Sequence, residues 1–132
     1  MLVADRNGLP VAAYVDEASP HEVTLVQKTL AARFVTALPE RLIGDRAYDS
    51  DPLDAELAAL GVEMISPHRK NRVAPQTQDG RPLRRYRRRW KIERLNAWLQ
   101  NFRRVTIRWD LYSTSYLGMV HLACIMILLR RL

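Results

Sequence analysis

The chain has 132 residues, 48% of them hydrophobic, which is enough for one domain with its own core and excludes a disordered polymer. Cys124 is the single cysteine, so an intrachain disulfide is excluded and a reducing cytosol is favoured. The start of the chain lacks the basic and apolar regions of a signal peptide. The longest apolar run, residues 116–129, is too short to cross a bilayer comfortably, so we expect a buried helix and no membrane partner.

The net charge of +7 is concentrated in one segment. Residues 1–68 carry 5 basic and 11 acidic side chains, net −6, whereas residues 69–108 carry 14 basic and 2 acidic side chains, net +12. Such a band repels itself unless a polyanion shares the surface, so nucleic acid is the expected partner. A solvated basic face is the alternative.

Two short strands open the chain. Residues 2–15 read as a hairpin around an Asn7–Gly8 turn. A helix follows, because Ser19 and Glu22 match a capping box. One face of this helix is expected to carry apolar residues at spacings of 3, 4 and 4: Val23, Val26, Leu30 and Phe34.

Two further strands are expected over residues 41–45 and 62–66, with a helix between them. We expect the strands to join the hairpin in one mixed sheet that packs against the helices. Asp45 lies at the carboxyl end of the first of these strands, just past its expected buried residues Leu42 and Ile43. In sheets with crossover helices, functional sites collect at the carboxyl ends of the strands. Asp45 is therefore the first candidate site residue.

The intervening helix has clear end signals. Asp51 is expected to cap it, Pro52 to occupy its first position and Gly61 to close it. Asp49 and Asp54 lie close by in the sequence, and we expect both carboxylates to be solvated.

The basic band begins as a loop and continues as a helix. Residues 67–82 hold three prolines and a glycine without periodicity, whereas residues 83–102 regain the helical period. A last helix is expected within residues 113–132. The long helix 83–102 carries an apolar seam at spacings of 3, 4 and 3: Ile92, Leu95, Leu99 and Phe102. The whole order predicts an α/β fold.

Glu93 is an isolated carboxylate among arginines on this long helix. Its helical face also carries Tyr86, Arg89 and Gln100. One interpretation is a set of surface ion pairs, each worth a few tenths of a kcal/mol. The other joins Glu93 to Asp45 as ligands of Mg²⁺, which prefers carboxylate oxygen and can activate water for phosphodiester cleavage.

Three stretches carry a family resemblance: LIGDRAYDSDPL (42–53), YRRRWKIERLNAWLQNFRRV (86–105) and YLGMVHLACIMILLRRL (116–132). They resemble the DDE transposases of bacterial insertion sequences, the insertion-sequence-five branch in particular. That family has a tyrosine, an arginine three residues on, a glutamate four further and a basic residue seven beyond. Tyr86, Arg89 and Glu93 match, with Gln100 at the last place, and Asp45 matches the family's second catalytic aspartate.

The resemblance implies a partial ribonuclease-H-like fold over residues 1–132 and cut-and-paste chemistry that depends on Mg²⁺ or Mn²⁺. Asp45 and Glu93 would be the catalytic metal ligands. The first aspartate of the family is missing, because neither Asp5 nor Asp16 matches it. The residues expected to bind DNA are Arg69, Lys70, Arg72, Tyr86, Arg87, Arg88, Arg89, Lys91, Gln100, Arg103 and Arg104.

Three interpretations stay open at this point. The chain is part of a transposase that cleaves and joins DNA, or a catalytically inactive DNA-binding fragment of one, or an RNA-binding or structural basic protein. For the transposase, the partners would be element ends and target DNA, with the upstream transposase segment or a second copy of the chain. The expected location is the bacterial cytoplasm, at the nucleoid.

Overall fold

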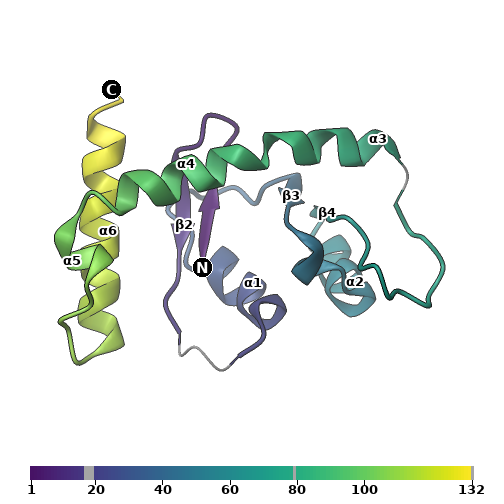
Figure 1. Ribbon diagram of the computed structural model, residues 1–132, viewed down its shortest axis with the longest axis horizontal. Helices are drawn as coiled ribbons and strands as arrows, with labels where there is room; N and C mark the ends of the chain where they lie inside the picture. The colour runs from purple at the N-terminus through teal and green to yellow at the C-terminus, as the bar shows by residue number, and fades with distance from the viewer. Residues whose placement is uncertain (17–19, 79, 132) are drawn as a thin grey trace. The chain divides into compact units, whose positions relative to one another are not determined.

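The computed structural model describes residues 1–16, 20–78 and 80–131 (Figure 1). It consists of two compact units, residues 1–36 with 90–132 and residues 37–89, and each is described by itself. The first unit contains β1 (Leu2–Ala4), β2 (Pro10–Ala13), α1 (Glu22–Ala31), α4 (Trp90–Leu99), α5 (Arg103–Thr106) and α6 (Ser113–Leu129). The second contains β3 (Arg41–Ile43), the 3₁₀ helix η1 (Arg46–Tyr48), α2 (Asp51–Ala59), β4 (Glu63–Ile65), α3 (Gly80–Leu83) and the 3₁₀ helix η2 (Arg84–Arg89).

The predicted hairpin is confirmed in the first unit, where β1 and β2 pair antiparallel (Figure 1). The Asp5 carboxylate fixes the turn, since its Oδ1 accepts the backbone N–H groups of Asn7 and Leu9, both at 2.8 Å. Gly8 has φ of 79°, a left-handed conformation that favours glycine.

The helix after the hairpin is shorter than expected. α1 has His21 as its N-cap residue, and Ser19 of the predicted capping box lies outside the described residues. α1 ends at Ala31, so the prediction that Phe34 lies on its apolar face is wrong. The N–H of Phe34 instead donates to the carbonyl of Val11 in β2, at 2.7 Å. The residues that α1 buries are Leu25, Val26, Thr29 and Leu30.

The core of the first unit lies where α4 and α6 meet the hairpin. Its buried members are Ala13, Leu95, Leu99, Val120, Ala123, Cys124 and Ile127. Ile92 and Phe102 pack against this cluster, which confirms the apolar seam. The predicted last helix is confirmed as α6, and Cys124 is a core residue. The expectation that this helix is buried is only partly met, because it buries one side and leaves Leu122, Ile125, Met126 and Leu129 exposed. Among the described residues, no helix combines the length and apolar character needed to cross a membrane.

In the second unit, β3 and β4 pair in parallel, with Arg41 opposite Glu63, and α2 is the crossover between them. The two pairs of strands form two separate two-stranded sheets within the described part of the chain, not the single mixed sheet expected from the sequence. Each strand pairs with the neighbour to which its own turn or crossover connects it. α2 begins at Asp51 after Ser50 as N-cap, one residue earlier than expected, and Gly61 follows its end with φ of 75°.

The predicted helix 83–102 is divided into shorter helices. α3 begins at Gly80, inside the predicted loop, and is followed by η2 and then α4, which ends at Leu99. Phe102 becomes the N-cap residue of α5, a short helix that the sequence pattern does not predict. A 3₁₀ helix eclipses residues three apart, and in η2 this brings Tyr86 and Arg89 together, with an Arg89 Nη1 to Tyr86 Oη distance of 3.1 Å.

Candidate functional site

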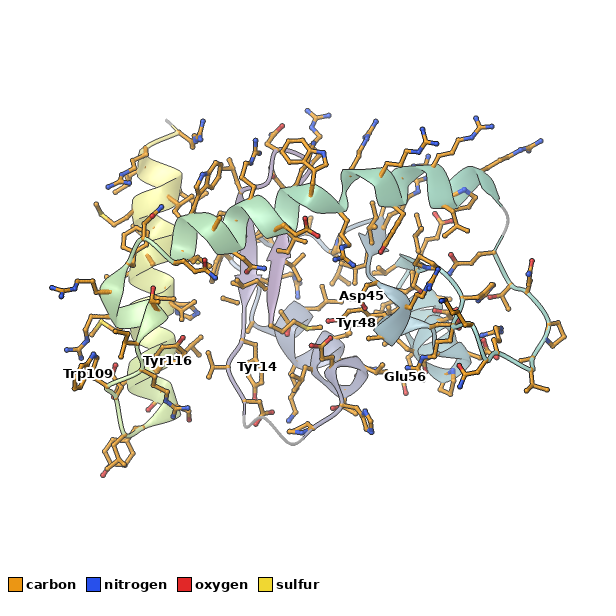
Figure 2. All side chains as sticks on the ribbon, viewed as in Figure 1. Tyr14, Asp45, Tyr48, Glu56, Trp109 and Tyr116 are labelled. Carbon is orange, nitrogen blue, oxygen red and sulfur yellow. The ribbon has the colours of Figure 1, made fainter. Side chains whose placement is uncertain are left out.

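Asp45 lies just beyond the carboxyl end of β3, as the sequence predicts, and close to Tyr48 (Figure 2). It is the N-cap residue of η1, where its Oδ1 accepts the N–H of Ala47 at 2.8 Å. The side chain is 42% exposed. Asp45 is therefore held through Oδ1, and its side chain as a whole stays partly exposed to solvent.

Gly44 has no side chain, and the Met64 and Tyr48 side chains pack against its backbone. A Cβ on Gly44 would lie 2.6 Å from Met64 Cε, 2.7 Å from Tyr48 Cδ2 and 2.9 Å from Tyr48 Cγ. The Met64 methyl is the end of a flexible side chain and can move away, whereas the Tyr48 ring can move only by rotation about its Cα–Cβ bond or together with its backbone. The Gly-Asp-x-x-Tyr order therefore packs an aromatic ring against a glycine and places Asp45 between them in the chain.

Arg89, in the basic band, reaches Asp45 within the second unit. Arg89 Nη1 lies 3.6 Å from Asp45 Oδ2, and Arg89 also contacts Tyr86, whose ring centroid is 5.6 Å from its guanidinium carbon. The two side chains of the ion pair are 34% and 42% exposed, so solvent screens the attraction. The arginine of the Tyr-Arg-Glu spacing thus lies beside the predicted catalytic aspartate, and the tyrosine lies beside that arginine.

Glu93 lies on the exposed side of α4, in the first unit, while Leu95 and Leu99 bury the opposite side. Asp45 belongs to the second unit, and each carboxylate is at the surface of its own unit. Carboxylate oxygens suit Mg²⁺ or Mn²⁺. Within residues 1–16, 20–78 and 80–131, no three acidic, histidine or cysteine side chains gather in a group that could hold a metal ion. Asp45 and Glu93 are thus chemically suitable ligands, and neither belongs to a complete site within its own unit.

Most of the predicted DNA-binding residues are accessible. Lys70, Arg87, Arg88, Gln100, Arg103 and Arg104 are exposed, and Tyr86, Arg89 and Lys91 are partly exposed. Arg104 also pairs with Asp110 at 2.9 Å. The Lys91 ammonium donates to the carbonyl of Arg6 in the hairpin turn. Exposed or partly exposed basic residues therefore remain on η2 in the second unit and, separately, on α4 and α5 in the first unit.

Arg69, which is exposed, and Arg72 both form hydrogen bonds within the second unit. The Arg72 side chain is only 10% exposed, and its Nη1 and Nη2 lie 2.8 Å from Asp49 and 2.6 Å from Asp51. Arg69 donates from Nε and Nη2 to the carbonyls of Arg46 and Ala47, at 3.1 and 2.7 Å. These donors are occupied, so Arg72 in particular has a structural role.

Asp49 corrects a prediction, because its carboxylate is not solvated: only 4% of the side chain is exposed. Burial raises the pKa of this carboxyl. The Arg69 backbone N–H, the His68 ring and the Arg72 guanidinium outweigh burial, so the pKa lies below its usual value of 3.8. Asp54 is likewise not fully solvated. Its Oδ1 is buried without a hydrogen-bond partner, and burial together with the charges of Asp51 and Asp49 raises its pKa.

The structural roles of Gly44, Asp49, His68 and Gln78 were not predicted from the sequence. Gln78 accepts the N–H of Ser66 at 3.1 Å and donates to the carbonyl of Met64 at 3.2 Å, so it extends the edge of β4. Periodicity signals only neighbours along one element, and these contacts join residues 12 to 23 positions apart. A proline-rich loop without periodicity gives no sign of such an ordered network.

Comparison with known proteins gives a consistent result. A family model described as Transposase DDE domain matches residues 1–128. The chain is also similar to two proteins that are each named "putative transposase" of an insertion sequence. For element IS402 of Burkholderia cepacia the identity is 30% over 134 residues, covering 96% of this chain and 60% of that protein. For element IS6501 of Brucella ovis it is 37% over 93 residues, covering 67% of each. No solved structure matches.

Proposed function

The chain belongs to the DDE transposase family, and we propose that it is part of the catalytic domain of a bacterial insertion-sequence transposase. The chain spans about 60% of the length of the IS402 relative, so the activity of a whole transposase is part of the proposal. The proposed reaction is metal-dependent cleavage of DNA at element ends, followed by strand transfer. The Tyr-Arg-Glu spacing supports assignment to the insertion-sequence-five branch.

The contact of Arg89 with Asp45, together with the hydrogen bond from Arg89 to Tyr86, carries the proposal. It joins the two motifs on which the family resemblance rests, although they are far apart in the chain. An arginine beside a catalytic carboxylate provides a charge that can hold a phosphate of the DNA backbone next to the reacting position. The proposed architecture is ribonuclease-H-like, which the antiparallel hairpin and the parallel β3–β4 pair with its α2 crossover support.

Asp45 and Glu93 are the proposed ligands of Mg²⁺ or Mn²⁺. A divalent cation bound there would supply a Lewis acid for phosphoryl oxygens and lower the pKa of a bound water. Asp45 offers Oδ2, because Ala47 already occupies Oδ1. We propose that a third carboxylate comes from a segment outside residues 1–132, joined to this chain or supplied by a second copy.

The remaining parts of the proposal concern partners and location. The DNA partners would be the element ends and the target, held by the exposed residues Lys70, Arg87, Arg88, Gln100, Arg103 and Arg104 together with Tyr86, Arg89 and Lys91. Arg69 would contribute to DNA binding mainly by connecting the loop after β4 to η1. The proposed location is the bacterial cytoplasm, at the nucleoid.

A second candidate function is DNA binding without catalysis. The absence of a three-carboxylate group from the described residues favours it for the isolated chain. Such a fragment would occupy element ends and compete with a complete transposase. The two candidates share the DNA-binding surface and differ in whether a completed chain cleaves.

A salt titration tests the DNA-binding part of both candidates. The chain is titrated with labelled duplex DNA at several salt concentrations. The logarithm of the binding constant should fall linearly with the logarithm of salt concentration, and Arg87→Gln with Arg88→Gln should reduce the slope by about 2. Lys28→Gln with Arg41→Gln removes the same charge outside the basic band and should leave the slope unchanged. Binding that is absent at low salt, or equal reduction by both pairs, contradicts the proposal.

A further inference from the structure

Asp49 is the centre of a buried polar network in the second unit. Its Oδ1 lies 2.9 Å from His68 Nδ1 and 2.8 Å from Arg72 Nη1, and its Oδ2 accepts the backbone N–H of Arg69 at 2.7 Å. Three donors thus compensate a carboxylate that is almost completely removed from water. The transposase chemistry proposed above gives this aspartate no role.

The network orders a long stretch of the loop after β4. His68 Nε2 accepts the N–H of Thr77 at 3.2 Å, so the ring proton lies on Nδ1 and is donated to Asp49. Arg72 also donates from Nε and Nη2 to the carbonyl of Pro75, at 3.1 and 2.9 Å. One carboxylate therefore connects residues 68–77, which have no regular secondary structure of their own.

Arg69 links this network to the turn that carries Asp45. Its backbone N–H is bound by Asp49, while its side chain binds the carbonyls of Arg46 and Ala47 in η1. Asp45 caps the same turn by accepting the N–H of Ala47. The contacts run without a gap from Asp49 through Arg69 to η1 and Asp45.

We propose that Asp49 is a positioning residue for the proposed metal ligand Asp45. It anchors the backbone at Arg69, and Arg69 then fixes the η1 turn and with it the direction of the Asp45 carboxylate. Residues that hold a metal ligand in its orientation, through hydrogen bonds or packing, affect metal affinity without contacting the metal. The inference rests on the proposed function, because it assigns the metal to Asp45.

The first test is independent of activity. Amide hydrogen exchange is measured by NMR on the 132-residue chain with Asp49→Asn, which keeps the shape of the side chain and removes its charge. The Ala47 N–H should exchange roughly tenfold faster, whereas the buried Leu57 and Val62 amides, in α2 and before β4, should be unchanged. An unchanged Ala47 amide overturns the proposal, and so does an equal acceleration of all three, which would indicate general loosening.

The second test measures the metal requirement of DNA cleavage by a polypeptide in which the chain is joined to the upstream transposase segment. Asp49→Asn should raise the Mn²⁺ concentration for half-maximal cleavage about tenfold or more, with DNA affinity unchanged. Asp51→Asn is the matched control. Asp51 also binds Arg72, but among the described residues its side chain has no hydrogen bond to Arg69 or to η1. An equal shift in both variants contradicts the positioning role. Absence of cleavage by the unmutated polypeptide contradicts the proposed function instead, and hydrogen exchange then decides the role of Asp49.

Discussion

Arg89 reaches Asp45 within one unit of the structure, with Nη1 3.6 Å from Oδ2. The arginine of one family motif therefore contacts the aspartate of another, through a pair that is only partly shielded from solvent. Such a pair contributes little to the free energy of unfolding. Its main consequence is that a cationic side chain lies beside the Asp45 carboxylate.

The first prediction separates these two roles. Arg89→Ala should lower the free energy of unfolding by less than about 1 kcal/mol, because exposed ion pairs contribute little. The same substitution should weaken binding to duplex DNA and reduce its salt slope by about 1. Arg41→Ala is the control, since Arg41 pairs with Glu63 at 2.8 Å in the same unit but outside the basic band. Equal loss of DNA affinity in both variants contradicts the assignment.

The second prediction concerns Gly44. Gly44→Ala should destabilise the chain by about 1–3 kcal/mol, because the new methyl group overlaps the Tyr48 ring and forces either the ring or η1 to move. Urea unfolding measures this change. Gly118→Ala provides the control. A Cβ at Gly118 would meet no atom within 4 Å outside its chain neighbours and its own helix backbone, so alanine there should raise the free energy of unfolding by about 0.5–1 kcal/mol. A stabilising Gly44→Ala would show that Tyr48 does not pack as described.

The third prediction concerns pH and Asp54. Burial, then the Asp51 and Asp49 charges, raise the pKa of Asp54 in the folded chain above its usual 3.8. The folded state is therefore penalised by the ionised carboxylate at neutral pH, and this penalty is relieved as the pH falls through the raised folded-state pKa toward 3.8. Asp54→Asn should raise the melting temperature at pH 7, and the gain should disappear in acid. A lower melting temperature at pH 7 contradicts this account.

The pKa of Asp49 is shifted in the opposite direction to that of Asp54, so the two residues can be compared within one chain. Its folded-state pKa lies below 3.8, so its stabilising effect is present above that value and is lost as the pH falls through the folded-state pKa. Asp49→Asn should therefore lower the melting temperature at pH 7. The difference from the unmutated chain should close in acid, where Asp54→Asn also loses its effect.

The fourth prediction concerns Cys124. Burial in the core raises the pKa of its thiol to about 11, and the residue is 1% exposed. The thiolate is the reactive form, so iodoacetamide at pH 8 should modify Cys124 only as fast as the chain opens. Addition of urea above the unfolding midpoint should make modification fast, as followed by mass spectrometry. Fast modification of the folded chain would place Cys124 outside the core.

Local features of the fold were predictable from the sequence. Leu95 and Leu99 recur at helical spacing, and Asp45 follows an apolar strand, so each signal lies within a short stretch. The role of Asp49 was not predictable, because its partners His68, Arg69 and Arg72 come from a loop 19 to 23 residues away. The division of the long helix was also missed, since periodicity does not distinguish α-helical from 3₁₀ winding over the six residues of η2.

The activity of the isolated chain should be limited by its carboxylates. Two-metal cleavage requires ligands that hold two ions about 3.5–4 Å apart. The proposed ligands Asp45 and Glu93 would supply two carboxylates, and the proposed third would come from outside residues 1–132. We therefore expect the isolated chain to bind DNA without nicking element ends.

Cleavage of a labelled element end in Mg²⁺, by the chain joined to the upstream transposase segment, tests the central claim most directly. The joined polypeptide should cleave, and Asp45→Asn or Glu93→Gln should each abolish cleavage while leaving DNA binding largely intact. Lys28→Gln, outside the basic band, should leave cleavage unchanged. Cleavage that persists in Asp45→Asn or Glu93→Gln, or robust Mg²⁺-dependent cleavage by the isolated 132 residues, would contradict the account.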